Sequence, residues 1–72
     1  MIKPGRYRHY KGKDYEVIGV ARHSENEEEY VVYRQLYGAG GLWIRPMGMF
    51  LESVSVEGTP VPRFRRLEEG PA

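Results

Sequence analysis

The sequence predicts a small all-β domain, an SH3-like barrel of five to six short antiparallel strands with one 3₁₀ turn. Short segments rich in β-branched and aromatic residues follow one another along the chain. Turn residues separate these segments at short and regular spacing, which is typical of a β-sandwich or barrel. No segment has the length and apolar periodicity of an amphipathic helix. Since an OB-type barrel usually carries a helix between strands, the SH3-like barrel is favoured.

The chain of 72 residues is long enough for one domain, and we expect a single domain over 1–72. Its ordered core is expected over about 5–67, with loose ends outside. A chain of this length buries only about 60% of the surface that its unfolded form exposes, so its core is small. No cysteine is present, which excludes a disulfide framework.

Three strands are expected in the first half of the chain. The first is "RYRHY" (6–10), and Gly12 can take positive φ in the turn that follows. The second is "YEVIGVAR" (15–22), where Gly19 indicates a bulge or a bend. A polar connection leads to the third and longest strand, "EYVVYRQLY" (29–37).

The second half adds three strands and the 3₁₀ turn. After the glycine-rich turn "GAGG", "LWIR" (42–45) is the fourth strand. "PMGMF" (46–50) is too short for a helix and predicts a 3₁₀ turn. "LESVSV" (51–56) alternates cleanly, and "VPRFRRL" (61–67) is the last strand. Pro60 and Pro62 place that last strand at an edge of the sheet.

The apolar members of the alternating strands predict the core. Alternation separates the two faces of a strand, but it does not reveal which face points inward. The predicted core residues are Val17, Val32, Leu42, Ile44, Phe50 and Val54.

Charge is unevenly distributed, although the net charge is only +1. Residues 1–24 carry six basic and two acidic side chains, whereas the connection "ENEEE" (25–29) carries four acidic ones. A basic lobe beside an acidic loop can steer a polyanion to one side. Charge runs of this kind are more often ordinary solvated surface.

The sequence contains no catalytic or metal-binding constellation. His23, Ser24 and Glu25 are the residue types of a catalytic triad, but sequence neighbours cannot adopt triad geometry. Beside His23 the chain has only His9, and the glutamates of the acidic connection lack the spacing of a calcium loop. The "GAGG" turn matches neither glycine-rich phosphate motif. We therefore expect no enzymatic activity, no metal and no cofactor.

Aromatic and basic residues are interleaved in the first strand and again around Trp43. Such residues can stack bases and contact phosphates, or they can line a groove for an extended peptide. A core of this size requires about half of the rings, so two or three are expected to be free for a ligand. The expected groove is made by the first strand, the "GAGG" turn and "LWIRPM". Its candidate ligand-binding residues are Tyr7, Arg8, His9, Lys11, Arg34, Tyr37, Trp43 and Arg45.

Three segments, "YRHYKG", "VVYR" and "LWIRPMGMF", resemble the motifs of a bacterial domain-of-unknown-function family of short proteins. The resemblance extends over about residues 3–66. The acidic connection "ENEEE" and the tail "LEEGPA" depart from the family pattern. The resemblance implies a small free-standing bacterial domain, and it assigns no function and no catalytic residue.

These observations together predict a non-enzymatic binding module that engages a peptide segment of a partner protein through an aromatic and basic groove. The alternative is binding of single-stranded nucleic acid, and a small enzyme of unknown reaction is the third hypothesis. No apolar run resembles a signal peptide or a membrane span, so we expect a cytoplasmic protein without membrane contact. Small domains without disulfides often associate, and we expect a monomer or a weak homo-oligomer.

Overall fold

A computed structural model describes residues 2–67 of the chain. These residues form seven strands and one helical turn, and the all-β prediction is confirmed. The predicted 3₁₀ turn is instead a single turn of α-helix that follows Pro46. In chain order the elements are β1 (Gly5–His9), β2 (Asp14–Arg22), β3 (Glu29–Gln35), β4 (Leu42–Pro46), α1 (Met47–Phe50), β5 (Ser53–Val56), β6 (Thr59–Pro62) and β7 (Phe64–Arg66).

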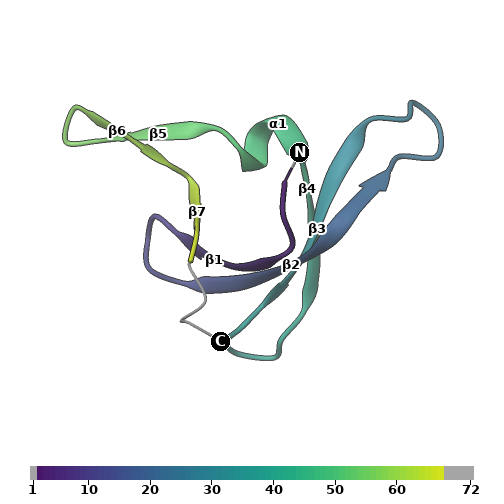
Figure 1. Cartoon of the computed structure of the whole chain (residues 1–72), viewed down its shortest axis with the longest axis horizontal. Helices are drawn as coiled ribbons and strands as arrows, with labels where there is room; N and C mark the ends of the chain where they lie inside the picture. Colours follow the sequence, from purple (N-terminus) through teal and green to yellow (C-terminus); the bar gives the residue numbers. More distant parts are fainter. Residues whose placement is uncertain (1, 68–72) are drawn as a thin grey trace.

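The strands form two antiparallel sheets. Five of them pair in the order β4-β3-β2-β1-β7, and β5 and β6 form a separate hairpin. The outer part of β2–β3 and the β5–β6 hairpin extend to opposite sides of the molecule (Figure 1). Within the described part of the chain no ladder joins β4 to β7, so these two strands are the edges of the larger sheet.

The predicted last strand is divided at Arg63. Residues Thr59–Pro62 pair with β5, whereas Phe64–Arg66 pair with β1. Both prolines of this segment lie on β6, which is an edge strand, as their missing N–H groups require.

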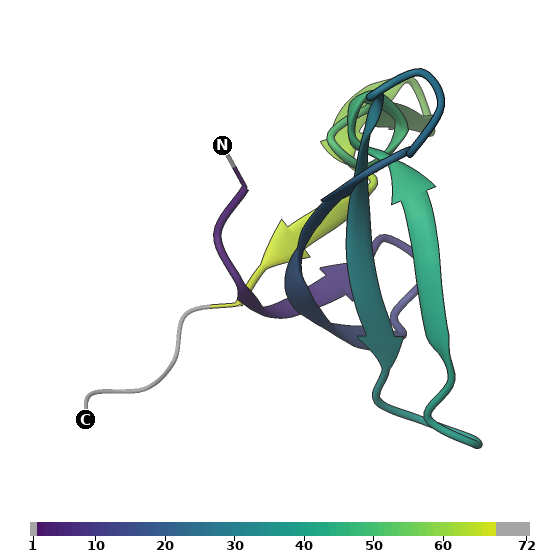
Figure 2. The same cartoon turned by 90° about the vertical axis from the view of Figure 1, so that its right-hand side faces the viewer.

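A β-bulge in β2 confirms the expectation for Gly19. Val17 pairs with Tyr33, but Gly19 pairs with Val32, so the intervening residue has no partner in β3. Because strand side chains alternate, one extra residue exchanges the two faces of the strand beyond it. The same irregularity increases the local twist, which suits the curvature of this hairpin in Figure 2.

The core lies on the concave side of the five-stranded sheet, beneath α1. Phe50 of α1 stacks on Phe64 of β7 with ring centroids 4.1 Å apart and an interplanar angle of 2°. Tyr33 contacts both rings edge-on. The buried apolar residues are Ile2, Tyr7, Val17, Val31, Tyr33, Phe50 and Phe64. The core predictions for Val17 and Phe50 are therefore confirmed.

The core predictions for Leu42 and Ile44 are wrong. These side chains are 58% and 63% exposed. Strand β3 turns Val31 and Tyr33 inward, and their partners on β4 are Arg45 and Trp43. Since directly opposed residues share a face, the alternate residues of β4 point to the convex side.

Two further core predictions are only partly met, because Val32 and Val54 are half-buried. Val32 lies on the same convex face as Ile44, its direct partner. Val54 lies on the β5–β6 hairpin, which projects from the larger sheet. For both valines the alternation of side chains along the strand was predicted correctly. Their burial depends on which elements cover that face of the strand, and the sequence does not show this.

Candidate ligand-binding cleft

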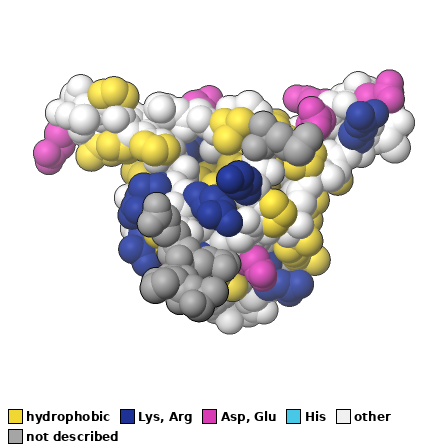
Figure 3. Space-filling view, in the orientation of Figure 1, with side chains coloured by type: hydrophobic (Ala, Val, Ile, Leu, Met, Phe, Trp, Pro, Cys, Tyr) yellow, Lys and Arg dark blue, Asp and Glu magenta, His cyan; other side chains and the backbone are white. Residues whose placement is uncertain are grey.

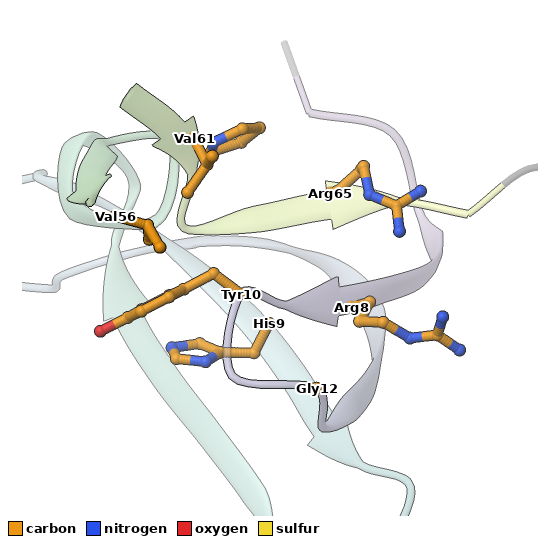
Figure 4. Close-up of a pocket in the computed structure, with 8 residues that line it drawn as sticks. Arg8, His9, Tyr10, Gly12, Val56, Val61 and Arg65 are labelled. Carbon is orange, nitrogen blue, oxygen red and sulfur yellow. The ribbon is translucent and has the colours of Figure 1, made fainter. Parts of the chain in front are cut away.

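A cleft of about 350 Å³ lies between the end of β1 and the β5–β6 hairpin (Figure 4). Val56 and Val61 face Tyr10 and His9 across it. This β1–β6 cleft is lined by Arg8, His9, Tyr10, Gly12, Val56, Val61, Pro62 and Arg65.

The turn after β1 forms one wall of the β1–β6 cleft. His9 donates its backbone N–H to the Lys13 carbonyl at 2.8 Å, and Gly12 donates to the His9 carbonyl at 2.7 Å. Gly12 has φ of +102°, a conformation that residues with a Cβ rarely adopt. The backbone N–H of Tyr10 donates to the Arg63 carbonyl at 2.9 Å, which attaches the turn to the chain between β6 and β7.

The β5–β6 hairpin forms the other wall. Glu57 and Gly58 both have positive φ, the pattern of a tight two-residue hairpin turn. The base of the hairpin is held by Arg63, whose backbone N–H donates to the Glu52 carbonyl at 3.0 Å. The Arg63 guanidinium also pairs with the Glu52 carboxylate at 2.8 Å. The valine side chains of the hairpin are thereby presented to Tyr10 on a fixed base.

His9 lines the cleft, and its ring lies among other aromatic rings. Its ring centroid is 4.6 Å from that of Tyr10 and 4.9 Å from that of Phe64. Burial lowers the pKa of His9 below its ordinary value of 6.5, and the positive charges of Arg45, Arg63 and Lys11 lower it further. The imidazole is therefore neutral at pH 7. Its Nδ1 accepts the Lys11 backbone N–H at 3.2 Å, so the proton of the neutral ring resides on Nε2.

Two arginines lie at the end of the cleft opposite Val56 (Figure 4). Arg8 and Arg65 are directly opposed on β1 and β7. Arg8 forms two hydrogen bonds to the Asp14 carboxylate, at 2.7 and 3.2 Å. This hydrogen bonding lowers the pKa of Asp14 below its ordinary value. Arg65 forms no ion pair with any residue of 2–67, so this end of the cleft attracts anions.

The space-filling view shows several lysine and arginine side chains over the central part of this face of the molecule (Figure 3). Acidic side chains on the same face lie mainly on the two projecting hairpins.

A profile of DUF1653, described as a protein of unknown function, matches residues 5–66. This match covers most of the chain. The chain belongs to the DUF1653 family. The fold is similar to the crystal structure of a DUF1653 protein from Bordetella bronchiseptica, with a TM-score of 0.86 and 37% sequence identity. The similarity covers 99% of this chain and 94% of the other, whereas a comparison with curated proteins gives no match.

The resemblance indicated by the three sequence motifs is thus confirmed, and no enzymatic family is indicated for this DUF1653 domain. The side chains that line the β1–β6 cleft include no serine, threonine, cysteine or carboxylate that could serve as a nucleophile beside His9. Residues 2–67 contain no group of three side chains suited to hold a metal ion. No helix in that range has the length and apolarity to cross a membrane.

Three of the predicted ligand-binding residues lie at or beside the cleft of this DUF1653 domain. Arg8 and His9 line it, and the Lys11 ammonium lies 5.8 Å from the centroid of the Tyr10 ring. Tyr7, by contrast, is only 6% exposed and donates its hydroxyl to the Lys3 carbonyl at 2.7 Å. Its ring belongs to the core and is not available to a ligand.

The other four predicted residues do not line the β1–β6 cleft. Arg34 reaches the Gly40 carbonyl at 3.4 Å, and Tyr37 shares a 2.6 Å hydroxyl–hydroxyl hydrogen bond with Tyr15. Trp43 lies on the edge strand β4, and Arg45 of the same strand covers the Phe64 ring. In the hydrogen-bonding order of the sheet β2 and β3 lie between β1 and β4, and the β1–β6 cleft is lined by no residue of "GAGG" or "LWIRPM".

Six cleft residues were not among the sequence candidates: Tyr10, Gly12, Val56, Val61, Pro62 and Arg65. Tyr10 and Arg65 belong to aromatic and basic segments that are evident in the sequence. The hairpin residues carry no such signal. The dipeptide "EG" in the sequence indicates a turn between β5 and β6. The position of this hairpin next to the turn after β1, however, depends on the long-range pairing of β7 with β1.

Proposed function

We propose that this DUF1653 domain is a non-enzymatic binding module whose β1–β6 cleft takes a peptide segment of a partner protein. The bound segment carries an apolar side chain next to an acidic one. One observation supports this most: an apolar wall and a pair of arginines, which have one carboxylate partner within residues 2–67, occupy opposite ends of one small cleft.

The chemistry of each end selects one part of the segment. Val56 and Val61 face Tyr10, and a ligand side chain between them would be removed from water, which stabilises the complex by about 25 cal/mol per Å² of apolar surface buried. At the other end, guanidinium groups bind carboxylates through paired N–H donors. Arg8 is already engaged with Asp14, so Arg65 is the principal acid contact in this proposal.

Single-stranded nucleic acid is the second candidate, and the same two arginines favour it. They would contact phosphates while a base stacks on the Tyr10 ring, which is 39% exposed. Two observations place it second. The facing wall of the cleft is aliphatic rather than aromatic. Trp43, the most exposed aromatic side chain of the described residues, lies at the far edge of the sheet from β1.

The test is a selection of peptides from a randomised nine-residue display library on the immobilised full-length chain. Counter-selection uses Val61→Arg, which fills the half-buried apolar wall with a long charged side chain. Peptides recovered on the natural chain and lost on the variant are expected to share an apolar residue adjacent to Asp or Glu. Isothermal titration with one such peptide should show at least tenfold weaker binding to Arg65→Glu.

The matched control is Arg22→Glu, an exposed arginine on the outer part of β2, which should leave the affinity unchanged. Selected peptides without an acidic residue would contradict the proposal, as would equal loss in both arginine variants. Fluorescence anisotropy with labelled (dT)₁₅ and (U)₁₅ over a salt series tests the second candidate. Binding with a log–log salt slope of about −0.7 for each phosphate contacted, and no peptide enrichment, would replace the first proposal by the second.

A further inference from the structure

Strand β4 is an edge strand whose outward hydrogen-bonding groups can be assigned. Gln35 donates its backbone N–H to the Gly41 carbonyl at 3.0 Å. In an antiparallel ladder, hydrogen-bonded pairs recur every second residue. The pairs Tyr33–Trp43 and Val31–Arg45 therefore bond across β3 and β4. The N–H and C=O groups of Leu42 and Ile44 point away from β3.

The same two residues are the most exposed aliphatic side chains of the larger sheet. Leu42 is 58% and Ile44 is 63% exposed. They lie on one face, and half-buried Val32 adjoins them as the direct partner of Ile44. Figure 2 shows β4 at the rim of the sheet, with no element of the described chain beyond it.

Natural edge strands are usually protected from further pairing by charge, proline or a covering element. Arg45 supplies a charge, but its guanidinium lies over the Phe64 ring on the inner side. Pro46 stands at the end of β4, where it leaves the middle of the strand unprotected. The β4 edge is therefore open to a strand that offers matching hydrogen-bonding groups.

We propose that the β4 edge is an interface at which a second copy of this chain adds its own β4 antiparallel, about a two-fold axis through Trp43. In this register Leu42 exchanges both backbone hydrogen bonds with Ile44 of the partner subunit. Ile44 does the same with Leu42 of the partner subunit. The four aliphatic side chains then form one apolar cluster on the convex face, and the interface closes on itself.

The register also suits the other residues of β4. The two Trp43 residues are opposed at a non-hydrogen-bonded position, where side chains approach most closely. Arg45 is opposed by Gly41 of the partner subunit, so no like charges are paired. Pro46, which has no N–H to donate, lies where the ladder ends.

Charge complementarity favours a second copy as the occupant. The acidic connection of residues 25–29 lies at the end of the sheet where β4 finishes, whereas the turn before Leu42 lies at the opposite end (Figure 2). Near that turn lie the basic residues Arg34 and Lys13, with the Lys13 ammonium 4.9 Å from the Tyr37 ring centroid. An antiparallel arrangement brings the acidic end of each copy toward the basic end of the other, which steers this orientation.

The first test is sedimentation velocity of the full chain over a concentration series up to about the millimolar range. The five residues of β4 on each side form an interface smaller than the standard size, so we expect weak association. The mass should rise from 8.4 kDa toward twice that value as concentration increases. Leu42→Lys should weaken association at least tenfold. Leu51→Lys, at an equally exposed leucine outside β4, should not change it.

The second test addresses the register. The chain has no cysteine, so a single introduced cysteine can form a disulfide only with the same cysteine of the partner subunit. Under mild oxidation Trp43→Cys should form a disulfide-linked dimer, because the opposed Cα atoms lie about 4.5 Å apart in such a pair. Ile44→Cys should link far less, since its two copies are more than about 7 Å apart in this register.

Several outcomes would overturn the proposal. If the chain remains monomeric at every concentration, the proposal is wrong, even if β4 accepts a strand of some other protein. Equal effects of the two lysine variants, each with a natural far-UV circular dichroism spectrum, place the contact elsewhere. More linkage through residue 44 than through residue 43 refutes the two-fold axis at Trp43.

Discussion

Arg8 and Arg65 lie directly opposite one another on β1 and β7, and within residues 2–67 only Arg8 is paired with an acid. Like charges at opposed positions destabilise a sheet. A repulsive pair at the mouth of a cleft is therefore retained at a cost to the fold, which fits a role in attracting an anion.

Reversing one charge of this pair should stabilise the domain. Arg65→Glu replaces repulsion with attraction to Arg8, so its urea midpoint should exceed that of the natural chain at low ionic strength. Arg65→Gln should lie between the two. Adding sodium chloride should reduce these differences, because exposed charges are screened. If Arg65→Gln has a higher urea midpoint than Arg65→Glu at low salt, the repulsion between Arg8 and Arg65 is not the cause of the change in stability.

Phe50 and Ile44 should respond very differently to truncation. Phe50→Ala removes a buried ring that stacks on Phe64 at 4.1 Å, and it should cost about 3–5 kcal/mol of unfolding free energy. Ile44→Ala removes an exposed side chain and should change that free energy by less than about 0.5 kcal/mol. Chemical denaturation at low micromolar concentration measures both. A large loss of unfolding free energy for Ile44→Ala would show that Ile44 is buried in solution, as the sequence predicted.

Stability should fall as pH drops below the ordinary histidine pKa of 6.5, because of His9. Burial and neighbouring cations lower its pKa in the folded state, so the unfolded chain binds more protons in this range. The contribution of neutral His9 is fully present above pH 6.5 and is lost as pH falls through the lowered folded pKa. Denaturation midpoints between pH 8 and pH 5 should show this loss, and His9→Gln should flatten the profile.

An NMR titration of the His9 ring provides the direct control for that prediction. Its midpoint should lie below 6.5 in the folded chain. A midpoint above 6.5 would reverse the sign of the expected pH dependence.

Tyr15 should titrate far later than a free tyrosine. Burial, and then the 2.6 Å hydrogen bond with Tyr37, raises its pKa from 10.0 to about 12. The ¹³Cζ shift of each assigned tyrosine can follow this over an alkaline series. Tyr37→Phe should lower the Tyr15 pKa only part of the way to 10.0, because burial is the larger cause. A complete return to 10.0 would identify the hydroxyl pair as the sole cause.

The β5–β6 turn should be stabilised by a single substitution. Glu57 has φ of +51°, which asparagine adopts more readily, and Gly58 follows with φ of +81°. Glu57→Asn should add about 0.5–1 kcal/mol of unfolding free energy, whereas Gly58→Ala should remove about 1–2 kcal/mol. Both are measured by chemical denaturation. If Gly58→Ala is neutral, the turn does not require the left-handed conformation in solution.

Several features were determined by the sequence alone because they depend on neighbours along the chain. Turn residues and alternating β-branched segments predicted an all-β domain, and Gly19 predicted a bulge or a bend at the position where β2 contains a bulge. The prolines of the last segment predicted an edge strand, since the missing N–H has the same effect in any fold. Three short motifs were sufficient to indicate the family, because their residues are contiguous in the chain.

Tertiary structure alone decided which faces are buried and where the cleft lies. Alternation is symmetric between the two faces of a strand, so Leu42 and Ile44 could be assigned inward until the pairing of β4 with β3 placed Trp43 and Arg45 there. The β1–β6 cleft joins residues more than fifty positions apart, from Arg8 to Arg65. Its position follows from β7 pairing with β1, a long-range contact whose partner no local pattern specifies.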